Sequence, residues 1–227
     1  HLNMMAQNPL AITGQVKCQG YGVANVVVTN GFDCVLTDAS GKYTIPYHRD
    51  ARFVYVTTPT GYLPQRDGSL PLFYQHIIEG TFIYDFSLVK NQRNDDRHLF
   101  LVQADVQLGK GEDVAAYAEY LKDMREFINR HSEYDLFVLD CGDIVGNALS
   151  LFPSYKQTSD VLDVPMYRVI GNHDMEYGVR SYEHSYKTYE ECFGPIYYSF
   201  NRGKAHYIVL DNCYYINRNY RYIGYID

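Results

Sequence analysis

The fold is decided by one stretch of sequence, Met166-Tyr167-Arg168-Val169-Ile170-Gly171-Asn172-His173-Asp174. Its first five residues form a short, mainly apolar run, which is typical of a parallel strand buried on both faces. Gly171 permits a tight turn, and the three polar residues after it would be exposed at the tip of that turn. Because open α/β sheets bind ligands at the carboxyl ends of their strands, the stretch predicts a functional loop at one edge of a parallel sheet.

Two further motifs of the same form precede this stretch. Asp105-Val106-Gln107 follows the apolar run 99–102, and Gly142-Asp143 follows the apolar run 136–139. The motifs are spaced by 38 residues from Asp105 to Asp143 and by 29 from Asp143 to Asn172, as one strand–helix crossover per motif requires. If the three strands are neighbours, their polar ends converge on an oxygen-rich site that suits a hard divalent cation. The sequence therefore points to a metal site and to hydrolysis.

The elements predicted after residue 98 follow the order of an α/β domain. The buried stripe of a first helix would consist of Val114, Tyr117, Leu121, Met124 and Ile128, which recur at helical spacing. A second helix is expected around 149–160. Strand, helix, strand, helix, strand is the order of a mostly parallel sheet with right-handed crossovers.

Residues 9–90 have the pattern of an all-β region. Turn signals stand at Asn30-Gly31 and at Asp38-Ala39-Ser40-Gly41, between short β-branched or alternating runs. In the segment 81–88, Phe82, Tyr84, Phe86 and Leu88 occupy every second position, which predicts a strand with one buried face. Short strands with frequent turns favour a small β-sandwich.

The domain organisation follows from these patterns. Residues 91–97 are polar throughout and predict a linker. We expect an N-terminal tail over 1–8, an all-β sandwich over 9–90, this linker, and an α/β domain over 98–227.

Composition excludes several classes of protein. Hydrophobic residues make up 46% of the chain and charged residues 21%, as in ordinary globular proteins. The formal net charge of −7 argues against a basic nucleic-acid-binding surface. The chain contains no apolar run of the roughly 18 residues that a transmembrane helix needs.

Cysteine and tyrosine usage leaves alternatives open. Cys18 and Cys34 could pair in an oxidising compartment, whereas the favoured alternative is that all five cysteines are separate and mostly buried thiols. The chain has 24 tyrosines and no tryptophan, and Tyr214, Tyr215, Tyr220, Tyr222 and Tyr225 crowd its last stretch. They suit a rim that contacts a partner or a sugar-like ligand, or simply amphipathic packing near the surface.

The three motifs together resemble those of the calcineurin-like metallophosphoesterases. That family's pattern runs Asp-x-His or Asp-x-Gln, then Gly-Asp, then Gly-Asn-His followed by Asp or Glu, and here the resemblance covers residues 98–227. It implies that this region is the front portion of the four-layer α/β/β/α metallophosphoesterase fold. It also implies hydrolysis of a phosphate mono- or diester.

The resemblance implies a dinuclear site with two divalent metal ions, drawn from Mn, Fe, Zn and Mg. Asp105 and Gln107 would ligate the first metal, Asp143 would bridge both, and Asn172 would ligate the second. Gln107 replaces the more frequent imidazole by a harder amide oxygen, which shifts the preference from zinc towards manganese or magnesium.

The same resemblance assigns catalytic roles. His173 would face the phosphoryl oxygens or the leaving group, and Asp174 would orient it. Gly146 stands where many members carry an acidic residue or an amide, and the neighbouring Asn147 could substitute for that group.

The segment 9–90 resembles the carboxypeptidase regulatory-like sandwich, on Gly14-Gln15-Val16, the run 22–28 and the run 37–45. The resemblance implies an accessory module common on exported enzymes. The chain starts at His1, so a processed or constructed N-terminus is expected. We therefore expect an exported protein, whether periplasmic, secreted or at the cell surface.

The family supplies further histidine ligands later in its pattern, ending in Gly-His-x-His. His184, on a helix expected over 182–191, and His206, in a strand, are both expected to be non-ligands. We expect the chain, which ends at Asp227, to be the front portion of a longer phosphoesterase. Its four candidate ligands are too few to hold two metals firmly, so we expect these 227 residues to be inactive or nearly so.

Two hypotheses on function stay open. The leading one is an exported two-domain hydrolase that acts on a phosphorylated small molecule or a phosphoprotein. The rival is a non-catalytic exported binding or scaffold protein that uses a phosphoesterase-like fold and a tyrosine-rich surface.

Overall fold

The computed structural model describes residues 10–216 and 219–222. Its N-terminal region consists of two facing sheets, one in the order β2-β1-β10-β7-β8 with β5 paired to β1, the other in the order β4-β3-β6-β9. The strands are β1 Ala11–Cys18, β2 Tyr21–Gly22, β3 Val27–Thr29, β4 Cys34–Leu36, β5 Lys42–Pro46, β6 Phe53–Thr57, β7 Tyr62–Asp67, β8 Leu70–Leu72, β9 Tyr74–His76 and β10 Phe86–Lys90. The predicted β-rich region is confirmed.

The turn chemistry seen in the sequence accounts for this region. The Asn30 side-chain oxygen accepts hydrogen bonds from the backbone N–H groups of Phe32 and Asp33, and Gly31 has φ +89°, a conformation that favours glycine. The strand predicted over 81–88 begins only at Phe86, in β10, but Tyr84, Phe86 and Leu88 are buried while the residues between them are exposed. The alternation therefore places one face of this segment in the core.

The second region is an α/β unit built on three parallel strands in the order β11-β12-β13. Its elements are η1 Asp95–Arg97, β11 His98–Gln103, α1 Gly111–Arg130, β12 Asp135–Asp140, η2 Leu149–Leu151, α2 Phe152–Ser159, η3 Asp160–Leu162, β13 Met166–Arg168, η4 Asn172–Asp174, α3 Tyr182–Ser185, α4 Lys187–Phe193, β14 Tyr198–Arg202, β15 Ala205–Val209, β16 Cys213–Ile216 and β17 Asn219–Tyr222. The predicted parallel sheet is confirmed. The single helix expected over 182–191 is instead divided into α3 and α4 at Tyr186.

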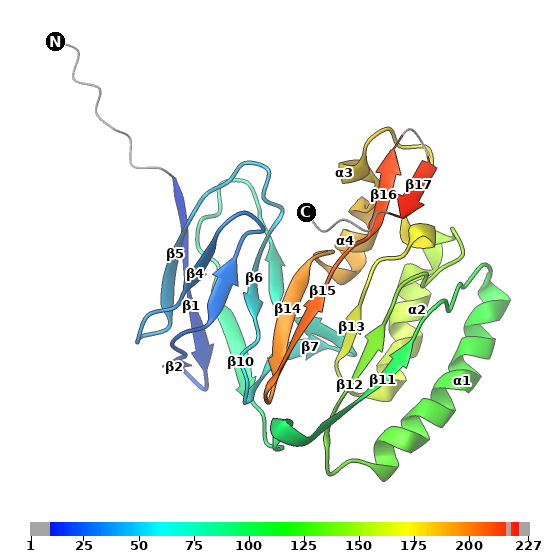
Figure 1. Cartoon of the computed structure of the whole chain (residues 1–227), viewed down its shortest axis with the longest axis horizontal. Helices are drawn as coiled ribbons and strands as arrows, with labels where there is room; N and C mark the ends of the chain where they lie inside the picture. The colour runs from blue at the N-terminus through cyan, green and yellow to red at the C-terminus, as the bar shows by residue number, and fades with distance from the viewer. Residues whose placement is uncertain (1–9, 217–218, 223–227) are drawn as a thin grey trace.

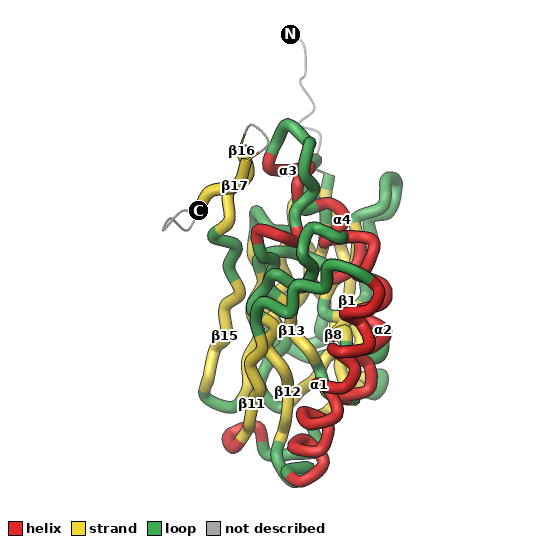
Figure 2. The backbone as a smooth tube through the Cα atoms, turned by 90° about the vertical axis from the view of Figure 1, so that its right-hand side faces the viewer, coloured by secondary structure: helices red, strands yellow, loops and turns green. Residues whose placement is uncertain are grey.

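The parallel sheet lies between a helical layer and a β layer. Helices α1 and α2 cover one face, and the β14–β15 hairpin lies on the other, beside the N-terminal sandwich (Figures 1 and 2). Of the stripe predicted for α1, all members are buried except the half-buried Val114. The layers are those expected for a metallophosphoesterase fold.

The two regions share one hydrophobic core. Phe137 of β12 and Tyr167 of β13 belong to the same buried cluster as Val54 and Phe73 of the N-terminal sandwich. The ring of Phe200, on β14, stacks on that of Tyr167 with the centroids 3.8 Å apart. Aromatic side chains of this size dominate the energetics of a core, so the N-terminal region is packed into the α/β unit rather than only tethered to it.

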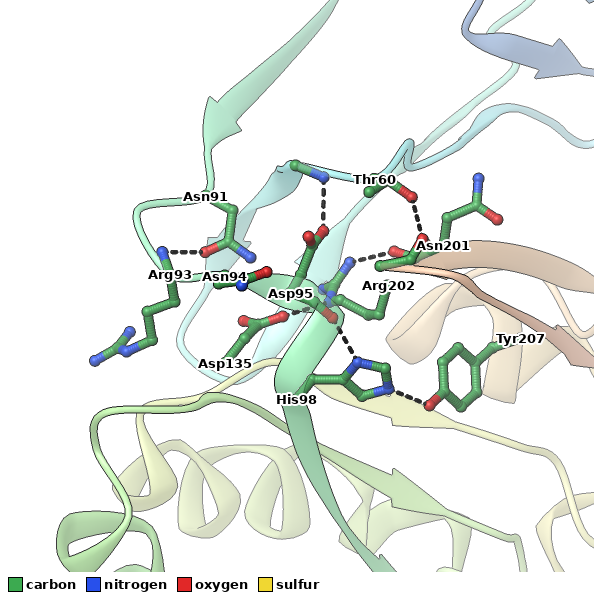
Figure 3. A network of polar contacts seen from close by, with 12 residues as sticks. Thr60, Asn91, Arg93, Asn94, Asp95, His98, Asp135, Asn201, Arg202 and Tyr207 are labelled. Carbon is green, nitrogen blue, oxygen red and sulfur yellow. Dashed lines mark hydrogen bonds and ion pairs between the residues drawn. The ribbon is translucent and has the colours of Figure 1, made fainter.

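The linker is itself anchored by a buried polar network (Figure 3). The Asp95 carboxylate accepts a hydrogen bond from the Gly61 N–H at 2.6 Å, while His98 Nδ1 lies 2.7 Å from the Asp95 carbonyl oxygen and its Nε2 2.6 Å from the Tyr207 hydroxyl. Because a carbonyl oxygen can only accept, Nδ1 carries the proton and Nε2 accepts from the tyrosine. His98 therefore ties the linker to β15.

A buried ion pair completes this network. Arg202 Nε lies 3.2 Å from the Asp135 carboxylate, and the Arg202 side chain is fully buried. Its guanidinium packs near the aromatic rings of Phe137, Tyr167 and Phe200. A charge this deeply buried is tolerated because it is paired and lies against aromatic faces.

Cysteines and tyrosines are used differently from the expectation. All five cysteines are free thiols, and only Cys213 is buried. The favoured view of separate thiols holds, but the expectation that they are mostly buried is wrong. In the part of the chain whose side chains are described, many tyrosines fill the cores, Tyr155, Tyr167 and Tyr215 among them. Side chains beyond Tyr215, including those of Tyr220, Tyr222 and Tyr225, lie outside the described part.

Within the described residues, no helix has both the length and the apolar character needed to cross a membrane.

A second ion pair joins the two regions near their surface. Arg52 Nε and Nη2 contact the two carboxylate oxygens of Glu190, each at 2.8 Å, and Nη1 donates to the Tyr186 hydroxyl at 2.7 Å. The Glu190 side chain is 5% exposed. Burial raises the pKa of Glu190 to about 7, against the opposing effect of Arg52.

We predict that Arg52→Met destabilises the protein by about 2 kcal/mol at pH 8, because it leaves a buried carboxylate without its cation. The folded pKa of Glu190 is raised, so the protonated form is favoured below about 7 and needs no cation there. Removing Arg52 raises this pKa further. The loss should therefore be larger at about pH 8 than at about pH 5 in urea unfolding.

The matched control is Arg49→Met, because Arg49 is 87% exposed and lies 3.6 Å from Asp50. Its unfolding free energy should change little. Equal losses for the two variants, or a loss for Arg52→Met that does not depend on pH, would contradict the assigned role of the pair.

Candidate functional site

The loops that follow β11 and β12 are held in an unusual backbone conformation. Asp105, Gln107, Asp143 and Asn147 have φ of +55°, +49°, +51° and +65°. Non-glycine residues in this left-handed region each cost on the order of 1 kcal/mol or more and concentrate at functional sites. Backbone hydrogen bonds between the loops hold the conformation, from the Asp105 N–H to the Gly142 oxygen at 3.0 Å and from the Gln107 N–H to the Asp143 oxygen at 2.8 Å.

The side chains of the first two loops converge. Gln107 Nε2 lies 3.5 Å from one carboxylate oxygen of Asp105 and 3.3 Å from one of Asp143. Two carboxylates that face one small group repel each other unless a positive or donating group lies between them. The Gln107 amide fills that position, so the loops present two carboxylates and one amide to a single point.

The loop after β13 reaches the same point. The His173 backbone N–H donates to the second oxygen of Asp143 at 3.0 Å. A Cβ at Gly171 would lie 2.2 Å from both the backbone nitrogen and a carboxylate oxygen of Asp143. Asn172 lies between these two contacts and is 3% exposed. The structure thus brings together Asp105, Gln107, Asp143 and the Asn172 loop, as the order of the motifs predicts.

The partner of His173 differs from the expectation. His173 Nδ1 lies 2.9 Å from the Asn147 side-chain oxygen, which can only accept, so Nδ1 carries a proton. Asp174 instead accepts hydrogen bonds from the backbone N–H groups of Val145 and Gly171, at 3.0 and 2.8 Å. The expected orientation of His173 by Asp174 is therefore corrected: Asn147 makes the contact, and Asp174 is committed to the backbone of two loops.

Asp174 is fully buried, and burial raises its pKa to about 7. Its position between the loops after β12 and β13 allows it to fix their spacing. It is a positioning residue in this geometry.

The sequence did not single out a buried polar row beneath these loops. Gln103, Asp140 and Arg168 are register partners across β11, β12 and β13, and all three are buried. Gln103 Nε2 donates to the Asp140 carboxylate at 2.6 Å, and the Tyr155 hydroxyl donates to the same oxygen. The only signal in the sequence was a polar residue directly after the runs 99–102 and 136–139 and one within the run 166–170.

Arg168 extends this row to the N-terminal region, where its Nη2 donates to the Ser69 hydroxyl at 2.9 Å. Its guanidinium carbon lies 5.3 Å from the centre of the Tyr155 ring. The row therefore links the strand ends below the site to the β7–β8 turn.

The donor set fits a hard divalent cation. It consists of the carboxylates of Asp105 and Asp143 and the side-chain amides of Gln107 and Asn172, and hard cations prefer oxygen ligands. Within the described residues, no group of three or more histidine, cysteine, aspartate and glutamate side chains is arranged to hold a metal ion. The ligands on offer in the described part of the chain are thus two carboxylates and two amide oxygens, a set that suits magnesium or manganese better than zinc.

The two histidines that follow the three motifs in the sequence have other contacts. His184 Nδ1 lies 2.6 Å from the Ser181 hydroxyl, and His206 Nδ1 lies 2.7 Å from the Asn201 side-chain oxygen. Neither contact involves the candidate ligands.

We predict that Gly171→Ala destabilises the protein by about 2 kcal/mol, because its Cβ forces the Asp143 backbone and carboxylate to move. The backbone of Gly171, with φ −107°, accepts alanine without strain. Gly111→Ala is the matched control, because no atom lies within 4 Å of its Cβ position. If guanidinium unfolding gave the two variants the same stability, the close approach of the loops would be wrong.

Comparison with known proteins agrees with this geometry. The protein-family model described as calcineurin-like phosphoesterase matches residues 98–223. A second family model, described as the N terminal of calcineurin-like phosphoesterase, matches residues 10–91. The second match assigns the N-terminal region to this family. The likeness of that region to the carboxypeptidase regulatory-like sandwich stays a prediction. No curated protein matches the chain.

Among solved structures, a purple acid phosphatase, PPD1 from the seeds of yellow lupin (Lupinus luteus), is similar at 12% identity with a TM-score of 0.38. The match covers 82% of this chain and 39% of that protein, so the chain spans well under half the length of its structural neighbour. A likeness at this level carries no argument about function. Since the calcineurin-like phosphoesterase model covers more than half of the sequence, the chain belongs to the calcineurin-like phosphoesterase family.

Proposed function

We propose that the site formed by Asp105, Gln107, Asp143 and Asn172 holds divalent metal ions and hydrolyses a phosphate mono- or diester. Members of the calcineurin-like phosphoesterase family use dinuclear metal sites. The observation that carries the proposal is the convergence of two carboxylates on the Gln107 amide, with the Asn172 loop packed against Asp143.

Asp105 and Gln107 would hold one metal, Asn172 the other, and Asp143 would lie between them. Both oxygens of Asp143 already face different partners, the His173 N–H and the Gln107 amide, which suits a bridging carboxylate. Bound divalent cations supply charge that neutralises the phosphate oxygens and lowers the pKa of a water molecule. Given the oxygen-rich donor set, we propose manganese or magnesium rather than zinc.

His173 would act on the phosphoryl group. Its Nδ1 proton is committed to Asn147, and its Nε2 lies 4.0 Å from an Asp143 carboxylate oxygen, on the side of the proposed metals. A protonated Nε2 there would donate a hydrogen bond to a phosphoryl or leaving-group oxygen as negative charge develops on it. Asn147 fixes the orientation of the ring, and Asp174 fixes the loop that carries it.

The described residues offer four candidate ligands, which is few for two metals. We propose that this chain is an exported phosphoesterase that, by itself, binds its metal ions weakly and turns over its substrate slowly. The substrate would be a phosphorylated small molecule or a phosphoprotein.

The experiment measures hydrolysis of p-nitrophenyl phosphate and of bis(p-nitrophenyl) phosphate with millimolar Mn²⁺. We expect slow turnover that a chelator abolishes and that Asp143→Asn lowers by about 100-fold or more, because Asp143 contacts both other loops. Asp123→Asn, an exposed carboxylate on α1, is the matched control and should keep the wild-type rate. Turnover that survives both chelation and Asp143→Asn would contradict the proposed function.

A further inference from the structure

A cavity lies at one end of the parallel sheet. The loops that follow β11, β12 and β13, here called the metal loops, lie at the opposite end. The cavity has a volume of about 1000 Å³ and is bordered by Asp135 and Leu136 at the start of β12 and by Pro165, just before β13. Its other walls come from β7, from the linker and from the end of α1. No residue of the three metal loops lines it. The volume is that of a site for a small molecule.

Three arginines line this cavity, each from a different part of the chain. Arg66 lies on β7, Arg93 in the linker and Arg125 near the end of α1. Each has one polar partner in the fold. Arg66 Nη2 lies 3.1 Å from an Asp163 carboxylate oxygen, Arg93 Nε donates to the Ser132 carbonyl at 2.8 Å, and Arg125 Nη1 donates to the Leu162 carbonyl. A guanidinium carries five N–H donors, so most donors of each arginine are left for a ligand.

The charges in the cavity do not cancel. Of its two carboxylates, Asp163 pairs with Arg66 and Asp135 pairs with the buried Arg202. Among the described residues, no carboxylate pairs with Arg93 or Arg125. In Figure 3 the Arg93 side chain extends away from the Asp135–Arg202 pair. A chain with a net charge of −7 thus keeps two unpaired guanidinium groups on one cavity, which raises the local concentration of anions there.

We propose that this cavity binds a small anion with at least two oxyanion groups, phosphate or carboxylate, held by Arg93 and Arg125 with help from Arg66. Guanidinium groups recognise these groups through paired, charge-assisted hydrogen bonds. The carbonyl contacts of Arg93 and Arg125 already restrain their side chains, so less freedom is lost when the ligand binds. Leu63 and Val89 line the wall from the N-terminal region, which leaves room for an uncharged body between the anionic groups.

Such a ligand would bridge the N-terminal region, the linker and α1. A ligand that binds only the folded chain raises its melting temperature by mass action. Binding would therefore reinforce the packing between the two regions at a place remote from the metal loops.

The test measures the melting temperature with pyrophosphate or with citrate, at constant ionic strength and with metals removed by a chelator. At a ligand concentration about ten times Kd we expect a rise of about 3 °C. A rise with pyrophosphate alone assigns the site to phosphate groups, and one with citrate alone assigns it to carboxylates. No rise with either, or an equal rise with sodium chloride, would overturn the proposal.

Arg93→Met is the decisive variant, because this exposed side chain has one anchoring contact, so we expect the variant to keep the fold. We expect the affinity, measured by calorimetric titration, to fall about tenfold or more. Arg49→Met removes an equal charge from an exposed site outside the cavity and should bind as the wild type does. Asp143→Asn should also keep the affinity, which separates this site from the proposed metal centre. Unchanged binding by Arg93→Met would contradict the assignment.

Discussion

The candidate site depends on the register of three parallel strands, which a buried row of polar side chains holds in place. Gln103, Asp140 and Arg168 are register partners across β11, β12 and β13. Gln103 and Asp140 share hydrogen bonds with each other and with Tyr155, and the Arg168 guanidinium lies near the Tyr155 ring. A shift of one strand by one residue would turn its polar member to the aromatic face of the sheet and leave its partners unsatisfied. The row thus specifies the register of the strands. Asp105, Asp143 and Asn172 follow the three members of the row by two to four residues, so the same register brings their loops to one point.

A second constraint is the core that the two regions share. Tyr167 stacks on Phe200 in a cluster that also includes residues of the N-terminal sandwich, and Arg168 reaches Ser69 in the β7–β8 turn. The parallel strands therefore meet the helices on one face and the β14–β15 hairpin with the sandwich on the other (Figure 1). The N-terminal region supports the sheet that carries the site, although it supplies none of the candidate ligands.

Much of this arrangement follows from the sequence, because strand, turn and helix patterns are local. The apolar runs before Asp105, Asp143 and Asn172 predict three parallel strands and the convergence of their ends, as found. The sequence offered Asn147 as a substitute amide, but its contact with His173 could not be predicted, because the left-handed backbone of Asn147 determines where its side chain lies. The shared core and the Arg93–Arg125 cavity also escaped prediction, because alternation of apolar residues shows that a face is buried but not what covers it.

The most direct test of the account is the crystal structure of this chain soaked in millimolar Mn²⁺, with anomalous scattering recorded near the manganese edge. If three strand-end loops form a metal centre, an anomalous peak should lie among the side-chain oxygens of Asp105, Gln107 and Asp143. The Gln107 amide would then be turned so that its oxygen faces the metal. Manganese bound elsewhere with no peak between these loops would contradict the central claim.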